Sequence, residues 1–364
     1  MATLEKDSHS EAPLVIVVGA GLGGLSAAVA IALAGHYRVL VLEAASKLGE
    51  IGAGIQLSSN CSKLLIRWGC AKYLEPNVVA PHHGRVCRWQ DGEILTDRIM
   101  NPTAEEKFGA PYWHIHRADL HQGLLDRARE LGVELRTNAP VTKVQTGDGE
   151  TSPGVTLESG ETFECIFVVG ADGIHSKIRT TLFPGFEKPR PTGDLAYRFR
   201  VATADMLEDE TLKPLAETPD THSWWGPGKH IVGYMLRGKQ MYNVITLFPD
   251  DGSLGDATRG TGTSDHLKEI YDGWCPKYRK PRATKIQMFS RDQRARNHLP
   301  DGPEQRERDA LLKNPDQQTK SHVWTWDEAD SSPAGDWVTG LHGYDAEHEA
   351  VKAIRSEGLA VLKT

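Results

Sequence analysis

The chain has 364 residues, of which 42 are Lys or Arg and 49 are Asp or Glu, so its formal net charge at pH 7 is −7. A mildly acidic chain without a block of basic residues is a poor match to nucleic acid or to an anionic membrane surface. An apolar content of 39%, with 36 glycines and 20 prolines, argues against a disordered chain and against a long helical bundle.

Cysteine spacing and hydropathy give an expectation about location. The five cysteines form no Cys-x-x-Cys pair, which argues against a disulfide framework and against a zinc site. The longest apolar run, residues 25–34, is far shorter than the ~20 residues that cross a bilayer. Residues 1–13 mix both charge signs and lead directly into a strand, unlike a secretory signal. We therefore expect a soluble, cytoplasmic protein.

The first predicted elements form one βαβ unit. Residues 14–18 (LVIVV) are typical of a strand that is buried on both faces. A glycine-rich turn follows at 19–24, and the Ala- and Leu-rich segment 25–34 predicts a helix. A second strand is predicted at 38–42, directly before Glu43.

The glycine turn has the spacing of a dinucleotide-binding site. Gly19 permits the tight turn, Gly21 lets the backbone approach a pyrophosphate, and Gly24 allows the helix to pack closely on the strand. The N-terminus of the helix then faces the phosphate charge. Glu43 ends the second strand, where an acid accepts hydrogen bonds from a ribose. This unit predicts a dinucleotide cofactor without separating NAD from FAD.

The middle of the chain predicts shorter elements and then a sheet. Helices are expected at 61–68 and 118–131, a hairpin at 84–97, and strands at 133–136, 140–145, 154–158 and 163–169. The last of these has the composition of a buried strand. From 194 to 248 the apolar pattern and the turn residues predict an antiparallel sheet. The region after about residue 280 is polar and has only short helical patterns.

Three segments resemble the FAD-dependent aromatic hydroxylases, most nearly the salicylate hydroxylase-like monooxygenases of fungal natural-product pathways. They are residues 49–60 (GEIGAGIQLSSN), 113–120 (WHIHRADL) and 168–179 (VVGADGIHSKIR). The resemblance implies an α/β fold, in which a Rossmann-type FAD-binding domain carries an inserted antiparallel-sheet substrate domain, as in p-hydroxybenzoate hydroxylase. The expected boundaries are 1–184 for the FAD-binding domain, 185–280 for the substrate domain and 281–364 for a short, irregular C-terminal region.

The resemblance also implies which residues hold the cofactor. In that family the acid that ends the second strand binds the adenosine ribose, and the backbone matching Ala53 and Gly54 lies against the flavin. The arginine matching Arg117 contacts the cofactor. The Asp-Gly pair matching Asp172 and Gly173 lies near the pyrophosphate and is linked to the use of NAD(P)H. The residues alone leave two alternatives open, namely that Arg117 is a surface residue at a helix start and Asp172 a turn residue.

Two further residues match the substrate site of related phenol hydroxylases, where they hold the substrate oxyanion. These are Arg198 and Tyr234. A guanidinium and a phenol stabilise a phenolate, and an ionised ring is more nucleophilic than a neutral one. The alternatives are that Arg198 pairs with a neighbouring acid and that Tyr234 packs in the sheet. Trp224 and Trp225 line an aromatic pocket or pack on a sheet face.

Several histidines raise the question of a metal. His114, His116 and His121 are close in sequence, but no carboxylate or cysteine accompanies them at a ligand-like spacing, so we expect no metal site. His82 and His83 are expected to form a solvated loop pair rather than to supply a general base.

The sequence departs from the family pattern in one respect. The family has a third flavin motif, an apolar strand ending in Gly-Asp before a glycine-rich helix start, and the chain has no such pattern. Residues 266–280 resemble the helix that precedes this motif, and residues 281–313 resemble helices that follow it. The Gly335-Asp336 pair is expected to lie in a loop.

The resemblance predicts an FAD-dependent monooxygenase. It would use NAD(P)H and oxygen to hydroxylate or epoxidise an aromatic, phenolic or related natural-product intermediate. The missing motif leaves open a redox-neutral enzyme or binding protein on the same fold, such as a cyclase or an isomerase. The expected partner is a small-molecule substrate, and a homodimer is left open.

Overall fold

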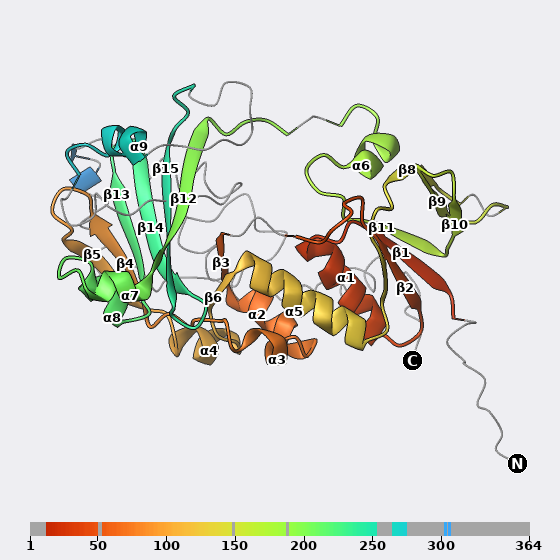
Figure 1. Cartoon of the computed structure of the whole chain (residues 1–364), viewed down its shortest axis with the longest axis horizontal. Coiled ribbons are helices and arrows are strands. Elements are labelled where there is room, and N and C mark those ends of the chain that lie inside the picture. The colour runs from red at the N-terminus through yellow and green to blue at the C-terminus, as the bar shows by residue number, and fades with distance from the viewer. Residues whose placement is uncertain are drawn as a thin grey trace, which may run out of the picture. The chain divides into compact units, whose positions relative to one another are not determined.

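The computed structural model describes residues 12–49, 53–147, 150–186, 189–252 and 264–274, together with 302–303 and 305–306. Two compact units divide the chain (Figure 1). The first comprises the described parts of Met1–Gly52, Leu65–Pro76 and His116–Arg190, and the second those of Ala53–Leu64, Asn77–Ile115 and the chain from Pro191 onward. Each unit therefore consists of three separate segments of the chain. The expected domains, with boundaries at residues 184 and 280, are instead three continuous segments. Residue 280 lies outside the described residues.

A four-stranded parallel sheet forms the centre of the first unit, in the order β11-β1-β2-β7. Its strands are β1 (Leu14–Val18), β2 (Arg38–Leu42), β7 (Glu134–Arg136) and β11 (Phe167–Gly170). Helix α1 (Leu22–Leu33) connects β1 to β2 and packs against α5 (Arg117–Glu130). The predicted βαβ unit is confirmed.

A smaller antiparallel sheet forms a second layer of this unit, in the order β10-β9-β8. Its strands are β8 (Val141–Gln145), β9 (Gly154–Leu157) and β10 (Thr162–Glu164). The two sheets share one buried cluster, to which β1, β2 and β9 contribute Ile16, Val18, Leu40, Leu42, Val155 and Leu157. Because both faces of β1 and β2 are buried, their sequences are almost wholly apolar. Two short helices, α3 (Ala71–Leu74) and α6 (Lys177–Leu182), complete the unit.

The single buried strand predicted at 163–169 is wrong in two respects. The segment forms two strands, because β10 pairs with β9 whereas β11 pairs with β1, and the chain changes sheets at Cys165 and Ile166. No glycine or proline marks this change, so the apolar run gave no sign of it. β11 also lies at the edge of its sheet, and Phe167 is 58% exposed.

A six-stranded sheet dominates the second unit, in the order β12-β15-β14-β13-β4-β5. Its strands are β4 (His83–Arg88), β5 (Ile94–Ile99), β12 (Asp194–Ala202), β13 (Thr221–Gly226), β14 (Lys229–Leu236) and β15 (Met241–Pro249). All neighbours are antiparallel except β13 and β4, which are parallel. The antiparallel sheet predicted for 194–248 is confirmed, and the predicted hairpin at 84–97 extends the same sheet.

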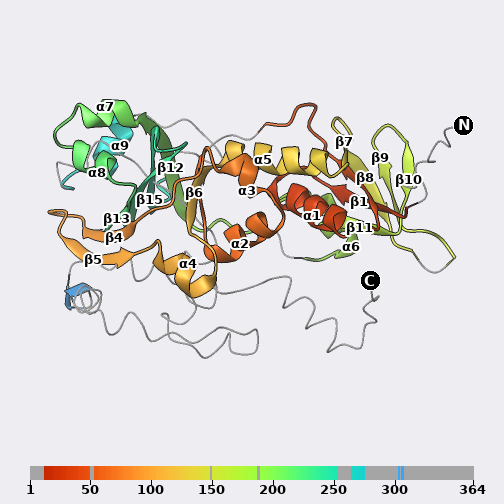
Figure 2. The same ribbon diagram turned by 90° about the horizontal axis from the view of Figure 1, so that it is seen from below.

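Helices cover one face of this sheet, which we call the helix-covered face. They are α7 (Thr203–Leu207), α8 (Lys213–Glu217) and α9 (Ser264–Ile270) (Figure 2). Their side chains Met206, Leu215 and Leu267 join a core with Trp224 and Tyr242 of the sheet. Among the described residues, no helix combines the length and apolar character that crossing a bilayer requires.

The opposite face of the six-stranded sheet carries a two-stranded ribbon, so we call it the ribbon face. The ribbon consists of β3 (Gly54–Leu57) and β6 (Trp113–His116). Along the chain, helix α2 (Ser59–Arg67) follows β3, and helix α4 (Thr103–Phe108) precedes β6. Contacts of Gly54 and His114 with Tyr234 fix one end of the ribbon on the sheet.

Candidate functional site

The glycine turn between β1 and α1 is closely packed at two of its glycines. Gly19 has φ +103°, and a Cβ there would lie 2.4 Å from the carbonyl oxygen of Ala171. A Cβ at Gly24 would lie 1.8 Å from the carbonyl oxygen of Gly19. The tight turn at Gly19 and the close helix packing at Gly24 are therefore confirmed.

The N-terminus of α1 is open where a phosphate would bind. Gly21 is the N-cap of α1 and supplies no side-chain cap, and a Cβ at Gly21 or Gly23 would meet nothing within 4 Å. Backbone N–H groups of a first helical turn need acceptors, and an anion supplies them. This open helix N-terminus fits a cofactor pyrophosphate, while the binding role of Gly21 stays a prediction.

The carboxylate of Glu43 is held beside this turn. One oxygen accepts a hydrogen bond from the backbone N–H of Ala20 at 2.7 Å, and the other from Ala45 at 2.9 Å. A carboxylate can accept about four hydrogen bonds, so both oxygens retain capacity for ribose hydroxyls. The predicted acid thus lies next to the predicted phosphate site, and its ribose contact stays a prediction.

Asp172 and Gly173 follow β11, and the carboxylate of Asp172 caps helix α6. Its Oδ1 accepts from the Ser176 hydroxyl at 2.5 Å, and its Oδ2 accepts from the backbone N–H groups of Lys177 at 2.7 Å and Ile178 at 3.2 Å. These bonds explain an aspartate at this turn by local structure alone. Gly173 has φ +79° and open space around it. Their cofactor contacts stay predictions, as does that of Arg117, the half-buried first residue of α5.

The three neighbouring histidines have three separate partners. His116 Nδ1 accepts from the backbone N–H of Ala118 and so caps α5. His121 Nε2 lies 2.7 Å from the carbonyl oxygen of Ala20, inside the glycine turn. His114 Nε2 lies 3.1 Å from the hydroxyl oxygen of Thr221. Sequence reasoning missed that a histidine on α5 supports the cofactor turn, because nothing local to His121 indicates it.

In the second unit, the segment expected to face the flavin packs on the expected substrate tyrosine. A Cβ at Gly54 would lie 2.8 Å from both Oη and Cε2 of Tyr234. The backbone N–H of Gly54 donates to Asn243 Oδ1 at 3.2 Å. Ala53, the preceding residue, is buried. The structure therefore brings Ala53, Gly54 and Tyr234 together at the ribbon face.

Arg198 and Tyr234 share the ribbon face. Arg198 pairs with Ile245 of β15, which in turn pairs with Val232 of β14. Because strand residues alternate between faces, Val232 and Tyr234 lie on the same side of the sheet. Arg198 is exposed, whereas Tyr234 is 1% exposed. The predicted pair thus combines an accessible cation with a buried phenol.

The charge state of Tyr234 follows from its burial. Burial raises the pKa of its hydroxyl above the ordinary value of 10.0, and the positive charge of Arg198 opposes this shift without cancelling it. The hydroxyl therefore stays protonated at neutral pH. In this state Tyr234 can donate a hydrogen bond to an anionic oxygen.

Because side chains alternate between the two faces along a strand, Trp224 and Trp225 lie on opposite faces of the sheet. Trp224 is 1% exposed and packs in the core of the helix-covered face. Trp225 points to the ribbon face, where it is half-buried and its Nε1 donates to Ser223 Oγ at 2.7 Å. His230 pairs with Trp225 and shares this face. Sequence reasoning passed over His230, although its distance of four residues from Tyr234 on one strand was a usable signal.

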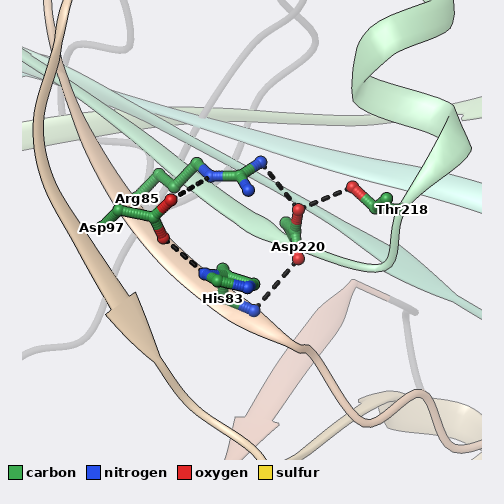
Figure 3. Close-up of polar contacts among 5 residues, drawn as sticks. All are labelled: His83, Arg85, Asp97, Thr218 and Asp220. Carbon is green, nitrogen blue, oxygen red and sulfur yellow. Dashed lines mark hydrogen bonds and ion pairs between the residues drawn. The ribbon is translucent and has the colours of Figure 1, made fainter.

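An ion network around the buried Asp220 lies at the β4–β5 edge of the sheet (Figure 3). Asp220 is 1% exposed and accepts from Arg85 Nη1 at 2.7 Å, from the backbone N–H of His83 at 3.0 Å and from Thr218 Oγ1 at 2.6 Å. Arg85 and His83 also contact Asp97, at 3.1 Å and 2.5 Å. Burial favours the neutral form of Asp97, but these two hydrogen bonds outweigh it and lower the pKa of the carboxyl.

This network changes the interpretation of the His82-His83 pair. His83 is the first residue of β4 and its ring is paired with Asp97, so it does not belong to a solvated loop. The network satisfies the buried carboxylate of Asp220 and joins β4, β5 and the start of β13. We assign it a structural role.

Together, these features define a class of protein. A parallel sheet with a glycine turn at a helix N-terminus accompanies a large antiparallel sheet that carries an arginine and a buried tyrosine on one face, which is the plan of the flavin-dependent hydroxylases. The family described as FAD binding domain matches residues 13–269. The chain belongs to this family, and FAD is the family's cofactor.

Relatives extend this family assignment. The FAD-dependent monooxygenase OpS4 of Beauveria bassiana (strain ARSEF 2860) is 36% identical over 264 residues, which are 72% of this chain and 61% of the relative. The 3-hydroxybenzoate 6-hydroxylase of Polaromonas naphthalenivorans (strain CJ2) is 34% identical over 279 residues, 75% of this chain and 66% of that enzyme. The chain therefore spans only about three fifths of the OpS4 relative.

Solved structures show the same fold. Klebsiella pneumoniae HpxO, complexed with FAD and uric acid, superposes with a TM-score of 0.61 at 22% identity, covering 74% of this chain and 64% of that chain. This likeness confirms the predicted p-hydroxybenzoate hydroxylase-like fold. The Gly335-Asp336 pair and the point at which the third flavin motif is missing, near residue 280, lie outside the described residues.

Proposed function

We propose that this chain is an FAD-dependent monooxygenase that uses NAD(P)H and oxygen to hydroxylate or epoxidise an electron-rich aromatic ring. The single observation that carries the proposal is the packing of Gly54 directly on Tyr234. The first residue belongs to the segment expected against the flavin, and the second is expected at the substrate. Their contact supports a reaction in which the flavin and the substrate lie next to each other.

Arg198 and Tyr234 have the chemistry to hold an ionised phenol. The exposed guanidinium attracts the anion, and the protonated Tyr234 hydroxyl donates a hydrogen bond to its oxygen. Both interactions favour the phenolate over the phenol, which increases the electron density of the ring. FAD, when bound, supplies the reduction by NAD(P)H and the activation of oxygen.

The other residues of the ribbon face suit a flat, partly apolar ligand. Trp225 and Val232 are half-buried on this face, and Ile245 is 6% exposed. An aromatic ring buries apolar area against such side chains while its oxygen stays near Arg198. A hydroxylated aromatic acid, such as the 3-hydroxybenzoate in the name of one relative, fits this combination.

The first test is the visible spectrum of the purified protein, recorded before and after incubation with FAD. We expect the spectrum of a bound flavin, followed by NADH or NADPH oxidation that 3-hydroxybenzoate or another phenol of a small panel stimulates. A protein that neither retains FAD nor oxidises NAD(P)H with any of these aromatics would contradict the proposal. Turnover of a substrate without NAD(P)H and oxygen would favour the redox-neutral alternative.

A matched pair of variants tests the role of Tyr234. Y234F removes the hydroxyl at the ribbon face, and Y242F removes a buried hydroxyl from the neighbouring strand on the helix-covered face. Loss of one hydrogen bond to a charged oxygen corresponds to about a tenfold or greater rise in KM. We expect this rise for Y234F and not for Y242F. Equal KM values in the two variants would remove Tyr234 from the substrate site.

A further inference from the structure

The ribbon is joined to the six-stranded sheet by two fully buried polar side chains. Asn243 of β15 and His114 of β6 are each 0% exposed. Asn243 Oδ1 accepts from the backbone N–H of Gly54 at 3.2 Å. The His114 ring lies 4.4 Å from the Tyr234 ring, centroid to centroid, and its Nε2 contacts Thr221 Oγ1 at 3.1 Å. Asn243 thus contacts the first residue of β3 directly, and His114 contacts the Tyr234 ring on which that residue packs.

Asparagine at residue 243 lowers the stability of the folded sheet, because part of its buried amide group is unpaired in the part of the chain that the structure describes. A backbone N–H can only donate, so the oxygen of the amide must face Gly54 and the NH₂ group must point elsewhere. Within the described residues this nitrogen makes no hydrogen bond. Burial of an unpaired donor is destabilising, and asparagine is disfavoured in strands. An apolar residue would serve the sheet better, so the amide is explained by its contact with Gly54.

His114 contributes a ring rather than a charge. Burial lowers the pKa of its imidazole to about 3, so the ring is neutral at neutral pH. Its contact with Thr221 fixes the orientation of the ring, and the ring in turn packs on Tyr234 with an interplanar angle of 41°. A neutral, oriented ring beside Tyr234 limits where the phenol can move.

We infer that Asn243 and His114 are positioning residues that fix the Ala53–Gly54 backbone against Tyr234. The spacing between the flavin-facing backbone and the substrate-facing hydroxyl is therefore set within the sheet unit. This inference rests on the proposed function for the roles of Ala53, Gly54 and Tyr234. The contacts themselves do not depend on the reaction.

The test compares each residue with a matched buried residue. N243L removes the acceptor for Gly54, and its control T246V changes a residue of the same strand that is also 0% exposed. H114F keeps an aromatic ring but removes the contact with Thr221. Its control, H222F, replaces a histidine that is 6% exposed and stacks on Trp224. All four variants lose a buried polar group, so a merely structural effect would lower their thermal midpoints alike.

Two measurements separate positioning from general stability. Hydrogen exchange of the Gly54 amide needs no cofactor, and we expect it to be at least about tenfold faster in N243L than in T246V, since about 1.4 kcal/mol of local opening energy is a factor of ten. The dissociation constant of FAD, measured by quenching of flavin fluorescence, should rise about tenfold in N243L and H114F and stay unchanged in their controls. N243D restores an oxygen acceptor and should recover slow exchange at Gly54.

The outcomes distinguish this inference from the proposed function. Exchange at Gly54 that is equal in N243L and T246V would overturn the inference, even if the wild type proves to be an active monooxygenase. If the wild type binds no FAD, the proposed function fails, and the exchange measurement alone decides the inference. N243A replaces N243L in the same comparison if the leucine variant does not fold.

Discussion

Gly54 and Tyr234 touch so closely that no side chain fits at residue 54. A Cβ there would lie 2.8 Å from the Tyr234 hydroxyl oxygen and 2.9 Å from Asn243 Cγ. Both neighbours are buried in the sheet and have little room to move. Glycine at this position therefore follows from a contact between distant parts of the chain rather than from a turn.

The substitution G54A should disturb this contact. Insertion of a methyl group into a packed site costs about 1–3 kcal/mol and displaces its neighbours. We expect a lower free energy of unfolding and weaker FAD binding. The control is G49A, because Gly49 is exposed and a Cβ there meets nothing within 4 Å. A G54A protein that matches G49A in chemical denaturation and in FAD titration would show that the site accommodates the methyl group.

Two adjacent glycines of α1 should respond in opposite directions. A Cβ at Gly24 would lie 1.8 Å from a backbone oxygen, whereas a Cβ at Gly23 meets nothing within 4 Å. We expect G24A to lower the free energy of unfolding by about 4 kcal/mol or more. G23A should raise it by up to ~1 kcal/mol, because alanine favours the helix. Urea denaturation of both variants tests this difference, and equal midpoints would contradict it.

The buried histidines should make stability depend on pH. The ordinary pKa of histidine is 6.5, and burial lowers that of His114 to about 3. Between these values the unfolded chain binds a proton that the folded chain excludes. Stability therefore falls as the pH falls from 6.5 towards 3, by up to about 1.4 kcal/mol per pH unit for this group.

The variant H114F has no imidazole at residue 114, so this difference in proton binding between the unfolded and folded chain is absent. Its stability should fall less steeply with decreasing pH than that of the wild type, as measured by denaturant midpoints at a series of pH values. H222F should show a similar effect over a narrower range, since burial, followed by the charge of Arg85, lowers the pKa of His222 to about 4. Parallel curves for wild type and H114F would mean that His114 takes up its proton in the folded state.

The ion network of Figure 3 should matter more than an exposed pair. D220N removes a carboxylate charge that is 1% exposed and leaves Arg85 paired with Asp97 alone. Loss of one partner of a buried ion pair costs about 3 kcal/mol or more, and we expect a value near the lower end because Arg85 is 23% exposed. E161Q breaks the pair of Glu161 with Arg136, whose side chains are 43% and 44% exposed, and should have no measurable effect. Chemical denaturation of both variants provides the comparison. A stable D220N protein would indicate that asparagine meets the same hydrogen bonds without the charge.

The cofactor turn could be predicted from sequence because its chemistry is local. The close contact of Gly24 with Gly19 lies within one βαβ unit, whereas the contact of Gly19 with Ala171, which follows β11, could not be predicted in this way. The antiparallel sheet was predictable for the same reason, since alternation and turns belong to single strands. The shared face of Arg198 and Tyr234, by contrast, was not predicted and follows from the strand register of the structure.

The remaining features depend on contacts that the sequence does not display. Asn243 is an unremarkable polar residue in a strand until Gly54 is placed on it. His121 reads as part of an amphipathic helix, and its bond to Ala20 depends on how α5 packs. The change of sheet at Cys165 and Ile166 has no turn residue to mark it. In each case tertiary packing determines the contact, and the local sequence pattern does not indicate it.

The bond between Gly54 and Asn243 also bears on how the protein is made. The two residues are 189 positions apart. A ribosome that adds about 5–20 residues per second needs roughly 10–40 s to synthesise that length. During this interval the nascent β3 has been made but its anchoring strand has not. Slow codons or chaperone contacts in the intervening stretch would therefore prolong the exposure of an unfinished ribbon and affect the yield of correctly folded protein.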